Sequence, residues 1–546
     1  MTEYSDSFKS LDSQSLESLY KKPKMRLFKT TPVEEIVGPA IAEVLPDHGK
    51  PWYKVKHILR LNLIILIPLL SAAVAGFDGS LLNGSFSLTQ WKNDFDNPTG
   101  NMLGLIGGAQ QIGCVIILPV CGWCSDYLGR KKTLYIGLVG VIIATIIQAT
   151  AFGVAQLVVS RIIVGAAGML VVQPAPLLLA ELAYPSLRGK ITALYWCFYY
   201  LGAILASWSC FGTRNYQSSW SWRIPTILQA AYPIIQLCFL HFVPESPRWL
   251  IMKGKYEKAR DILIEHHAGG DVNSRLVEVE LTEIVAAIEV DKISNKAKWS
   301  DLVATPGNRK RTYIAVTLGV FAQWNGIAVV SYYLSLILDS VGITSVTMQT
   351  LINGILQIFN LFAAAGGALL VDNLGRRKLL LTSGGGMLIS FVIWTALSAN
   401  FEQTGSGGSG KAVVAFIFIF YGFYDVAMTS LLFAYPSEIS TTLIRSKIVS
   451  VELFSIYAAL VVANFCNPIA LDSIHWKYYL VFVVVLALGT ANIYFFYPET
   501  KGYSLEEISK IFDGEESSLE VTSSDALKSN ELKAETHHVE NSKDLV

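Results

Sequence analysis

Twelve stretches of this sequence are long and apolar enough to cross a lipid bilayer as helices. A bilayer core of about 30 Å requires about 20 consecutive apolar residues. The stretches that meet this requirement are 59–82, 102–122, 133–152, 157–179, 190–212, 223–243, 312–338, 350–371, 379–399, 412–435, 448–468 and 477–497. Only 16% of the residues are charged, against about 25% in soluble proteins. We therefore predict an all-α membrane protein with twelve transmembrane helices.

The positions of lysine and arginine indicate how these helices are oriented. These residues crowd the N-terminal tail, the turns "GRKK" and "GRRK", the segment 248–311 and the C-terminal tail, whereas the alternate loops hold few of them. Cytoplasmic loops of membrane proteins carry the excess of Lys and Arg. Both termini are therefore expected on the cytoplasmic side of a multi-pass protein.

The sequence also repeats itself. "DYLGRKK" at 126–132 returns as "DNLGRRK" at 372–378, "ELAYPSLRGK" at 181–190 returns as "EISTTLIRSK" at 438–447, and "PESPRWL" at 244 is echoed by "PETKGYS" at 498. One six-helix unit has thus been duplicated into two parallel repeats. In transporters built this way, the substrate lies near the midplane between the halves, and rocking of the halves alternates its exposure.

The duplication divides the chain into five parts. We expect a cytoplasmic tail at 1–58, a six-helix half at 59–249, a cytoplasmic linker with short amphipathic helices at 250–311, a second six-helix half at 312–500 and a cytoplasmic tail at 501–546. The linker helices follow from apolar residues at three- and four-residue spacing in "YEKARDILIEHH" and "SRLVEVELTEIVAAIEV".

Composition and motifs argue against several other classes of protein. The net charge is zero, which disfavours a nucleic-acid partner. The seven cysteines lie in or beside apolar runs, without the spacing of a disulfide framework or a zinc site. The eight histidines are scattered, and the chain has no nucleophile constellation or phosphate-binding glycine loop. We expect neither an enzyme nor a bound metal or cofactor.

Five motifs in order carry a resemblance to a known family. "GWCSDYLGRKK" at 122–132, "PESPRWL", "PETKGYSLEEI" and Arg161 with "VGAAG" at 164–168, together with the repeat "DNLGRRK", resemble the sugar porter family of the major facilitator superfamily over about residues 59–510. "YYLGAILASWSCFGTRNYQSSWSWRIP" at 199–225, "SYYL" and "YPSE" look like its fungal branch of lactose permeases and cellodextrin transporters. The narrower resemblance implies a disaccharide substrate, with a hexose as the alternative.

Buried acids are the first candidates for function. An ionised Asp at the centre of a membrane helix costs about 2.5–3.5 kcal/mol on insertion scales, so Asp78 needs a reason to be there. Topology places Asp78 and Arg161 in the outer halves of the first and fourth helices, at similar depth. Family members that couple to protons carry the same pair, so the resemblance implies proton coupling, and the alternative is a static ion pair.

Two further acids lie in the apolar stretches of the second half. Asp425 lies near the middle of the tenth helix, where it is a candidate for proton coupling, for contact with sugar hydroxyls, or for an ion pair with another helix. Glu452 lies near Lys447 at the start of the eleventh helix, and we expect its side chain to extend to the membrane surface.

A sugar site needs hydrogen-bond donors and acceptors, together with aromatic rings that stack on the pyranose. The resemblance assigns sugar contacts to Gln323, Tyr332, Tyr333 and Asn360. Four family positions are changed here. The Gln of the fifth helix falls on Trp196, the later Asn of the seventh on Ala328, the Trp of the tenth on Phe433 and a Gln of the eleventh on Ile456. Asn325 is a candidate for a displaced amide. These changes predict a pose that differs from the usual hexose pose.

Charged residues at the cytoplasmic ends of the helices resemble the family network that closes the inner side of the protein. We expect pairs between Glu181 and Arg188, Glu245 and Arg248, and Glu438 and Arg445, and within the repeated turns. The full set is Asp126, Arg130, Glu181, Arg188, Glu245, Arg248, Asp372, Arg376, Glu438, Arg445 and Glu499. The alternative role is to anchor the topology by charge.

The sequence therefore predicts a proton-coupled sugar symporter of the plasma membrane, working as a monomer among membrane lipids, with the proton as its only coupling ion. A facilitative uniporter and a sugar sensor that does not transport are the two alternatives.

Overall fold

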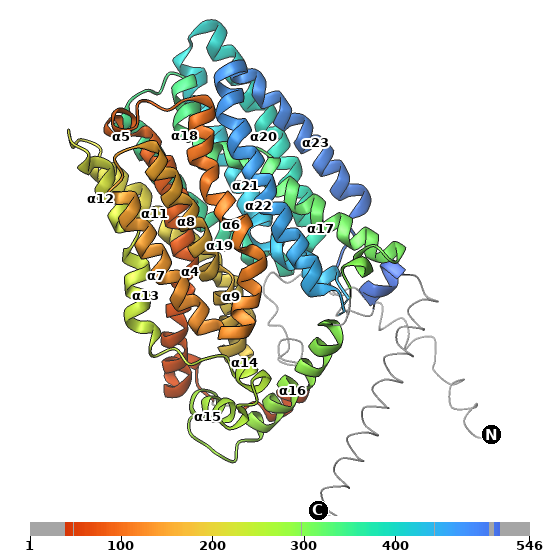
Figure 1. Cartoon of the computed structure of the whole chain (residues 1–546). Coiled ribbons are helices and arrows are strands. Elements are labelled where there is room, and N and C mark those ends of the chain that lie inside the picture. Colours follow the sequence, from red (N-terminus) through yellow and green to blue (C-terminus); the bar gives the residue numbers. More distant parts are fainter. Residues whose placement is uncertain (1–38, 47–48, 296–297, 442, 502–506, 514–546) are drawn as a thin grey trace, which may run out of the picture.

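The computed structural model describes residues 39–513, apart from 47–48, 296–297, 442 and 502–506. Most of the two terminal tails therefore lies outside the described residues. All regular elements in the described part are helices, and they form an upright bundle (Figure 1).

The first six predicted membrane crossings are found within a few residues of their expected bounds. They are α4 (Lys56–Ser87), α6 (Gly100–Leu128), α7 (Arg130–Ala149), α8 with α9 (Val154–Val172, Pro174–Leu182), α10 with α11 (Arg188–Tyr195, Cys197–Thr213) and α12 with α13 (Trp220–Leu228, Ala231–Leu240). The last six are α17 with α18 (Pro306–Trp324, Ile327–Ser340), α19 (Val346–Leu374), α20 (Arg376–Thr404), α21 (Gly407–Ile439), α22 (Arg445–Ile474) and α23 (Tyr479–Phe496).

The number of crossings agrees with the prediction of twelve. Ten helical runs in the described residues are long and apolar enough to span a membrane, and a pair bent by 42°, Pro185–Thr192 with Cys197–Thr213, makes an eleventh. The run Arg445–Phe496 has 52 residues and contains both α22 and α23. Tyr497, just after α23, bonds to Thr317 of α17 at 3.0 Å, so α23 returns to the end where α22 begins. This run therefore crosses twice.

Short helices between the halves define the two ends of the bundle. α14 (Pro247–Met252), α15 (Tyr256–His266) and α16 (Arg275–Asn295) lie together at one end, which we call the linker end (Figure 1). α5 (Thr89–Asp94) lies at the opposite end, called the far end. The remaining short elements are α3 (Pro39–Val44) and the 3₁₀ turns η1 (Trp52–Lys54), η2 (Pro185–Leu187), η3 (Trp299–Leu302) and η4 (His475–Tyr478).

In the described residues, the two halves share one large hydrophobic cluster, and its first-half members lie toward the far end. One large cluster combines first-half residues such as Phe86, Trp91 and Phe95 with the buried side chains of the second half. The clusters nearer the linker end each belong to one half: that around Leu61 and Leu179 to the first, and that around Ile448 to the second. The structure is therefore sealed between the halves at the far end.

A helix break places backbone polar groups in the middle of the seventh crossing. α17 ends at Trp324, and α18 begins at Ile327 after Gly326, whose φ is +100°. A β-carbon on Gly326 would lie 2.4 Å from the ring of Phe391. The glycine is thus required both by its backbone conformation and by the neighbouring ring. Breaks of this kind are common where membrane transporters bind their substrates.

Candidate functional site

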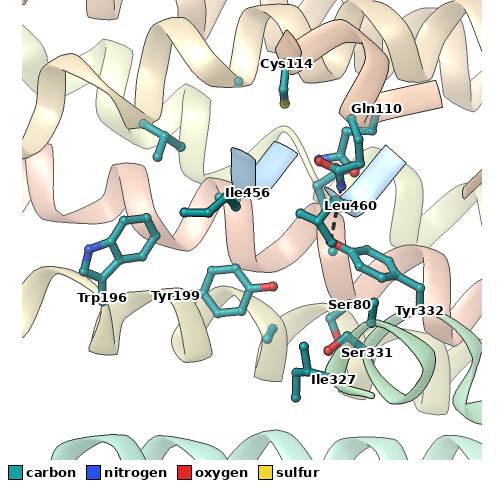
Figure 2. A pocket seen from close by; sticks show the side chains of 18 of the residues that line it. Ser80, Gln110, Cys114, Trp196, Tyr199, Ile327, Ser331, Tyr332, Ile456 and Leu460 are labelled. Atoms are coloured by element: carbon teal, nitrogen blue, oxygen red, sulfur yellow. Dashed lines mark hydrogen bonds between the residues drawn. The ribbon is translucent and has the colours of Figure 1, made fainter. Parts of the chain in front are cut away.

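A cavity of about 260 Å³ lies between the two halves. Its wall is formed by α4, α6, α7, α8 and α11 of the first half, with Gln229 between α12 and α13, and by α17, α18, α19, α21 and α22 of the second. Figure 2 shows the hydroxyls of Tyr199 and Tyr332 pointing toward one another across a space bordered by Ile456 and Leu460. The cavity therefore combines polar and apolar surfaces contributed by both halves.

Asp78 and Arg161 lie side by side, as the topology predicts. Asp78 is 2% exposed and Arg161 is fully buried, and Asp78 Oδ1 lies 3.6 Å from Arg161 Nη1. Asp78 also forms part of the cavity wall. A distance of 3.6 Å is too long for a hydrogen bond, so the two side chains form a loose ion pair.

Both members of this pair have other partners. Arg161 donates from Nε to the carbonyl oxygen of Ile106 at 3.0 Å and from Nη2 to Gln110 Oε1 at 2.9 Å. Asp78 Oδ1 accepts a hydrogen bond from Gln229 Nε2 at 3.0 Å, and its Oδ2 atom has no partner. Arg161 is thus held in place without Asp78, and one carboxyl oxygen is open to bind a proton.

Most of the predicted sugar contacts line the cavity. Gln323 and Tyr332 reach it from the seventh crossing, Asn360 from α19, and Trp196 and Phe433 from opposite halves. Asn360 is fully buried, and neither its Oδ1 nor its Nδ2 atom has a hydrogen-bond partner. Since buried polar groups are nearly always paired, this amide is available to a ligand or to water.

Two of the predicted sugar residues lie outside the cavity wall. Asn325 is fully buried, and its Oδ1 atom accepts a hydrogen bond from the backbone N–H of Ile327 at 3.0 Å, so it caps the start of α18. Tyr333 is also fully buried and donates to the backbone oxygen of Asn464 at 2.8 Å. Asn325 therefore stabilises the helix break, and Tyr333 joins α18 to α22 of the same half.

Trp196 and Phe433 form a pair that crosses between the halves. Their rings stack with centroids 4.9 Å apart and planes at 9°. Trp196 lies at the junction of α10 and α11, and Phe433 lies in α21. Trp196 and Phe433, two of the positions that differ from the family pattern, therefore contact each other and close one side of the cavity with an aromatic stack.

Several polar residues of the cavity wall were not predicted from the sequence. Gln110 and Gln111 are adjacent amides in α6, and Gln111 donates to the hydroxyl of Tyr332 at 3.2 Å. Gln357 lies three residues before Asn360 on the same face of α19. The sequence could have indicated these residues, because amides that are adjacent or three residues apart are unusual inside an apolar helix. The other polar residues of the wall are Ser80, Tyr199, Tyr200, Gln229, Ser331, Tyr421, Tyr424, Thr429 and Tyr457.

The two further acids have different surroundings. Asp425 is fully buried behind the cavity wall, where its Oδ1 atom accepts hydrogen bonds from Tyr200 at 2.5 Å and Thr429 at 3.0 Å. Glu452 is also fully buried, and neither carboxyl oxygen has a partner. The expectation that Glu452 extends to the surface is therefore wrong. Glu452 lies two turns into α22, where Gly319 of α17 packs against its backbone oxygen.

The charged residues of the first half form a network at the linker end. Arg130 pairs with Asp126 (Nη1 to Oδ1, 3.2 Å) and with Glu181 (Nε to Oε2, 3.3 Å). Glu181 thus pairs with Arg130 in the neighbouring helix rather than with the exposed Arg188. Glu245 accepts from the backbone N–H of Lys131 at 3.2 Å, near the N-terminus of α7. Burial raises the pKa of Glu245.

The second half repeats this arrangement. Arg376 pairs with Glu438 (Nη2 to Oε1, 3.1 Å), and its backbone N–H donates to Glu499 at 2.8 Å. Arg445 donates to the backbone oxygen of Ser440 at 3.4 Å, so the expected pair of Glu438 with Arg445 is replaced by the pair with Arg376. Arg248 lies in α14, at the linker end. The side chain of Asp372 lies outside the described residues.

A glycine makes room for each of the two carboxylates at these helix N-termini. Gly129 and Gly375 precede α7 and α20 with φ values of +103° and +90°. A β-carbon would lie 2.4 Å from a carboxyl oxygen of Glu245 in the first case and 2.7 Å from one of Glu499 in the second. The duplicated sequence motif therefore corresponds to a duplicated geometry.

We expect the substitution Gly375→Ala to weaken the network of the second half. The backbone conformation would cost about 1–3 kcal/mol, and displacement of Glu499 would remove a charged hydrogen bond of about 1.5–3 kcal/mol. Thermal unfolding of the purified protein in detergent should show a clearly lower midpoint. Gly385→Ala is the matched control, since Gly385 lies in α20 with open space around it. Equal midpoints for the two variants would contradict the assigned geometry.

Comparison with known proteins places this architecture among transporters. The family model described as "Sugar (and other) transporter" matches residues 64–512. The MFS-type transporter oryC of Aspergillus oryzae is 30% identical over 75% of this chain and 77% of its own length. The low-affinity glucose transporter HXT3 of Saccharomyces cerevisiae is 28% identical over 86% of this chain and 84% of its own length.

Solved structures support the same fold. The inward open conformation of the xylose transporter XylE from E. coli matches with a TM-score of 0.69 and 23% identity, covering 83% of this chain and 100% of that chain. A structure titled as the proton:xylose symporter XylE bound to 6-bromo-6-deoxy-D-glucose matches with a TM-score of 0.67 and 23% identity, covering 83% and 99% of the two chains.

Proposed function

Because the chain belongs to the sugar (and other) transporter family of the major facilitator superfamily, we propose that it carries a sugar together with protons across the plasma membrane. The family is one of transporters and not of enzymes, as predicted. The observation that carries the proposal is the buried acid–base pair, Asp78 with Arg161, in the wall of a polar cavity between two halves.

The geometry of Asp78 supports proton coupling. Its Oδ2 atom has no partner, and Arg161 is held by hydrogen bonds to Ile106 and Gln110, while its Nη1 atom has no hydrogen-bond partner. Protonation of Asp78 would therefore end its ion pair with Arg161 and leave the guanidinium fixed by these two bonds. Because ionised groups are expensive in the membrane interior, this change of charge alters the free energy of the site and so links proton binding to the movement of the halves.

The cavity supports a polyhydroxylated ring as the substrate. Asn360 offers a free donor and a free acceptor, and Gln323 and Gln357 lie in the same wall. Tyrosines and the stack of Trp196 on Phe433 provide apolar faces for the ring.

Two classes of sugar, monosaccharides and disaccharides, are candidates for the substrate. Two observations favour a monosaccharide in this state. Some relatives are named as glucose transporters. The cavity volume is just below the range of about 300–1,000 Å³ that is typical of sites for drug-sized ligands. The narrower resemblance favours a disaccharide such as lactose or cellobiose, which needs a wider cavity in the loaded state.

Alternating access follows from the two-half architecture. The Lys and Arg bias of the sequence favours a cytoplasmic linker end, so a structure sealed at the far end is an inward-facing state. We infer that the opposite state seals the linker end, where the networks of Arg130 and Arg376 lie. The pairs Arg130–Glu181 and Arg376–Glu438 each lie within one half and are largely covered in this state, and we infer that they rearrange when the linker end closes.

Reconstituted vesicles test this function directly. The purified protein would be given a pH gradient, acidic outside, and labelled glucose, xylose, lactose, cellobiose or maltose. We expect at least one sugar to accumulate above its external concentration and to lose this accumulation when a protonophore is added. Equilibration without accumulation would show a uniporter, and binding without flux would show a sensor. Either result would overturn the proposal.

A further inference from the structure

Asp425 is a second buried acid at the boundary between the halves. It lies in α21 and is fully buried. Its Oδ1 atom accepts hydrogen bonds from Tyr200 of α11, in the other half, and from Thr429 of its own helix. Its Oδ2 atom has no partner. Within the part of the chain that the structure describes, Asp425 forms no ion pair.

The surroundings of Asp425 lack a cation and are rich in neutral titratable groups. Cys197, Tyr199 and Tyr200 face it from α11, and Tyr421 and Tyr424 face it from α21. An ionised carboxylate without a cation is costly in a membrane interior. Both hydrogen-bond donors converge on Oδ1, which leaves Oδ2 as the oxygen that can carry a proton.

Neighbouring tyrosines of α11 connect the two acids. A β-carbon on Gly79, the residue after Asp78, would lie 2.8 Å from the hydroxyl of Tyr199. The next residue, Tyr200, donates its hydroxyl to Asp425. One turn of α11 therefore places the hydroxyl of Tyr199 beside the residue that follows Asp78, and the hydroxyl of Tyr200 on Asp425.

We propose that Asp425 is a second proton-binding site, so that the transporter carries one proton on each half with every sugar. This inference rests on the proposed function of a proton-coupled sugar transporter. An ionised Asp425 would hold Tyr200 by a charge-assisted hydrogen bond, which is about twice as strong as a neutral one. Binding of a proton would therefore loosen this contact between the halves and allow them to move.

Accumulation in vesicles distinguishes one coupled proton from two. With the membrane potential clamped at zero, each pH unit across the membrane supplies about 1.4 kcal/mol per proton. Two protons per sugar would allow about 100-fold accumulation at a gradient of one unit, and one proton would allow about 10-fold. We expect the first value for the unchanged protein and the second for Asp425→Asn, which retains sugar uptake.

Two other variants complete this experiment. Glu452→Gln is the matched control, because Glu452 is an equally buried acid of the same half that is not part of the cavity wall. It should retain the accumulation of the unchanged protein. Tyr200→Phe removes the cross-half bond without removing an acid, so it should change the uptake rate and leave the accumulation limit unchanged. Equal accumulation limits for Asp425→Asn and the unchanged protein would overturn the inference.

A direct readout separates this inference from the proposed function. Infrared spectra of the purified protein titrated in detergent would report protonated carboxyl groups, whether or not sugar flux is coupled. The difference between the unchanged protein and Asp425→Asn should contain a carboxyl band that titrates. Its absence would overturn the second site even if transport is proton-coupled. Absence of coupling in all variants with the band present would instead refute the proposed function.

Discussion

Replacement of Asp78 by asparagine is expected to lower uphill accumulation of sugar sharply. The amide keeps the size of the side chain but cannot bind and release a proton. Arg161 keeps its bonds to Ile106 and Gln110, so the helix packing around the site should survive. Labelled sugar should therefore still exchange with unlabelled sugar across vesicles, while the accumulation at a gradient of one pH unit falls from about 100-fold to the roughly 10-fold limit of the one proton left at Asp425, and to the equilibrium ratio when Asp425→Asn is added.

A matched acid serves as the control for this variant. Asp339 lies at the far end of α18, near Lys92 and Gln349, outside the cavity wall. Asp339→Asn should accumulate sugar as the unchanged protein does. Accumulation in Asp78→Asn equal to that of the unchanged protein would show that the buried pair is only structural.

Replacement of Gly202 by valine is expected to prevent correct folding. Gly202 of α11 lies against α4, where a β-carbon would be 1.9 Å from the backbone oxygen of Ala73. Gly76 of α4 lies equally close to α11, with its β-carbon position 1.8 Å from the oxygen of Tyr199. Small residues at such crossings let membrane helices approach closely. Because the obstacle is backbone, the helices must separate, which moves the elements that carry Asp78 and Tyr199.

The loss of folding free energy caused by this separation should exceed the roughly 1–3 kcal/mol that is typical of overpacked cores. Size-exclusion chromatography of a fluorescent fusion would report how much of the protein is extracted as a single folded species. Gly212→Val tests the same change on the same helix, at a position with open space around it, and should behave like the unchanged protein. A normal Gly202→Val profile would contradict the close crossing of α4 and α11.

The crossings were predictable from sequence because the thickness of the membrane fixes the length of an apolar helix. The predicted stretch 102–122, for example, corresponds to α6 at Gly100–Leu128. The breaks inside crossings were not predictable in this way. The break at Asn325 and Gly326 depends on a positive φ and on the ring of Phe391, and a scan for apolar length detects neither.

The site was predictable where topology alone determines depth. Asp78 and Arg161 meet because two antiparallel crossings bring residues at equal depth together. The direction of a side chain around its helix needs the packing of the neighbours. Asn325 therefore turned out to support the helix break, Tyr333 bonds to α22, and Glu452 is buried rather than extended to the membrane surface.

The central claim is that sugar and protons move through this protein together. The most direct test is the external pH of a weakly buffered suspension of cells that lack their own sugar transport and express this chain. Addition of a transported sugar should cause a transient alkalinisation of the medium, because protons enter with the sugar. Uptake of labelled sugar without any change in external pH would contradict the account.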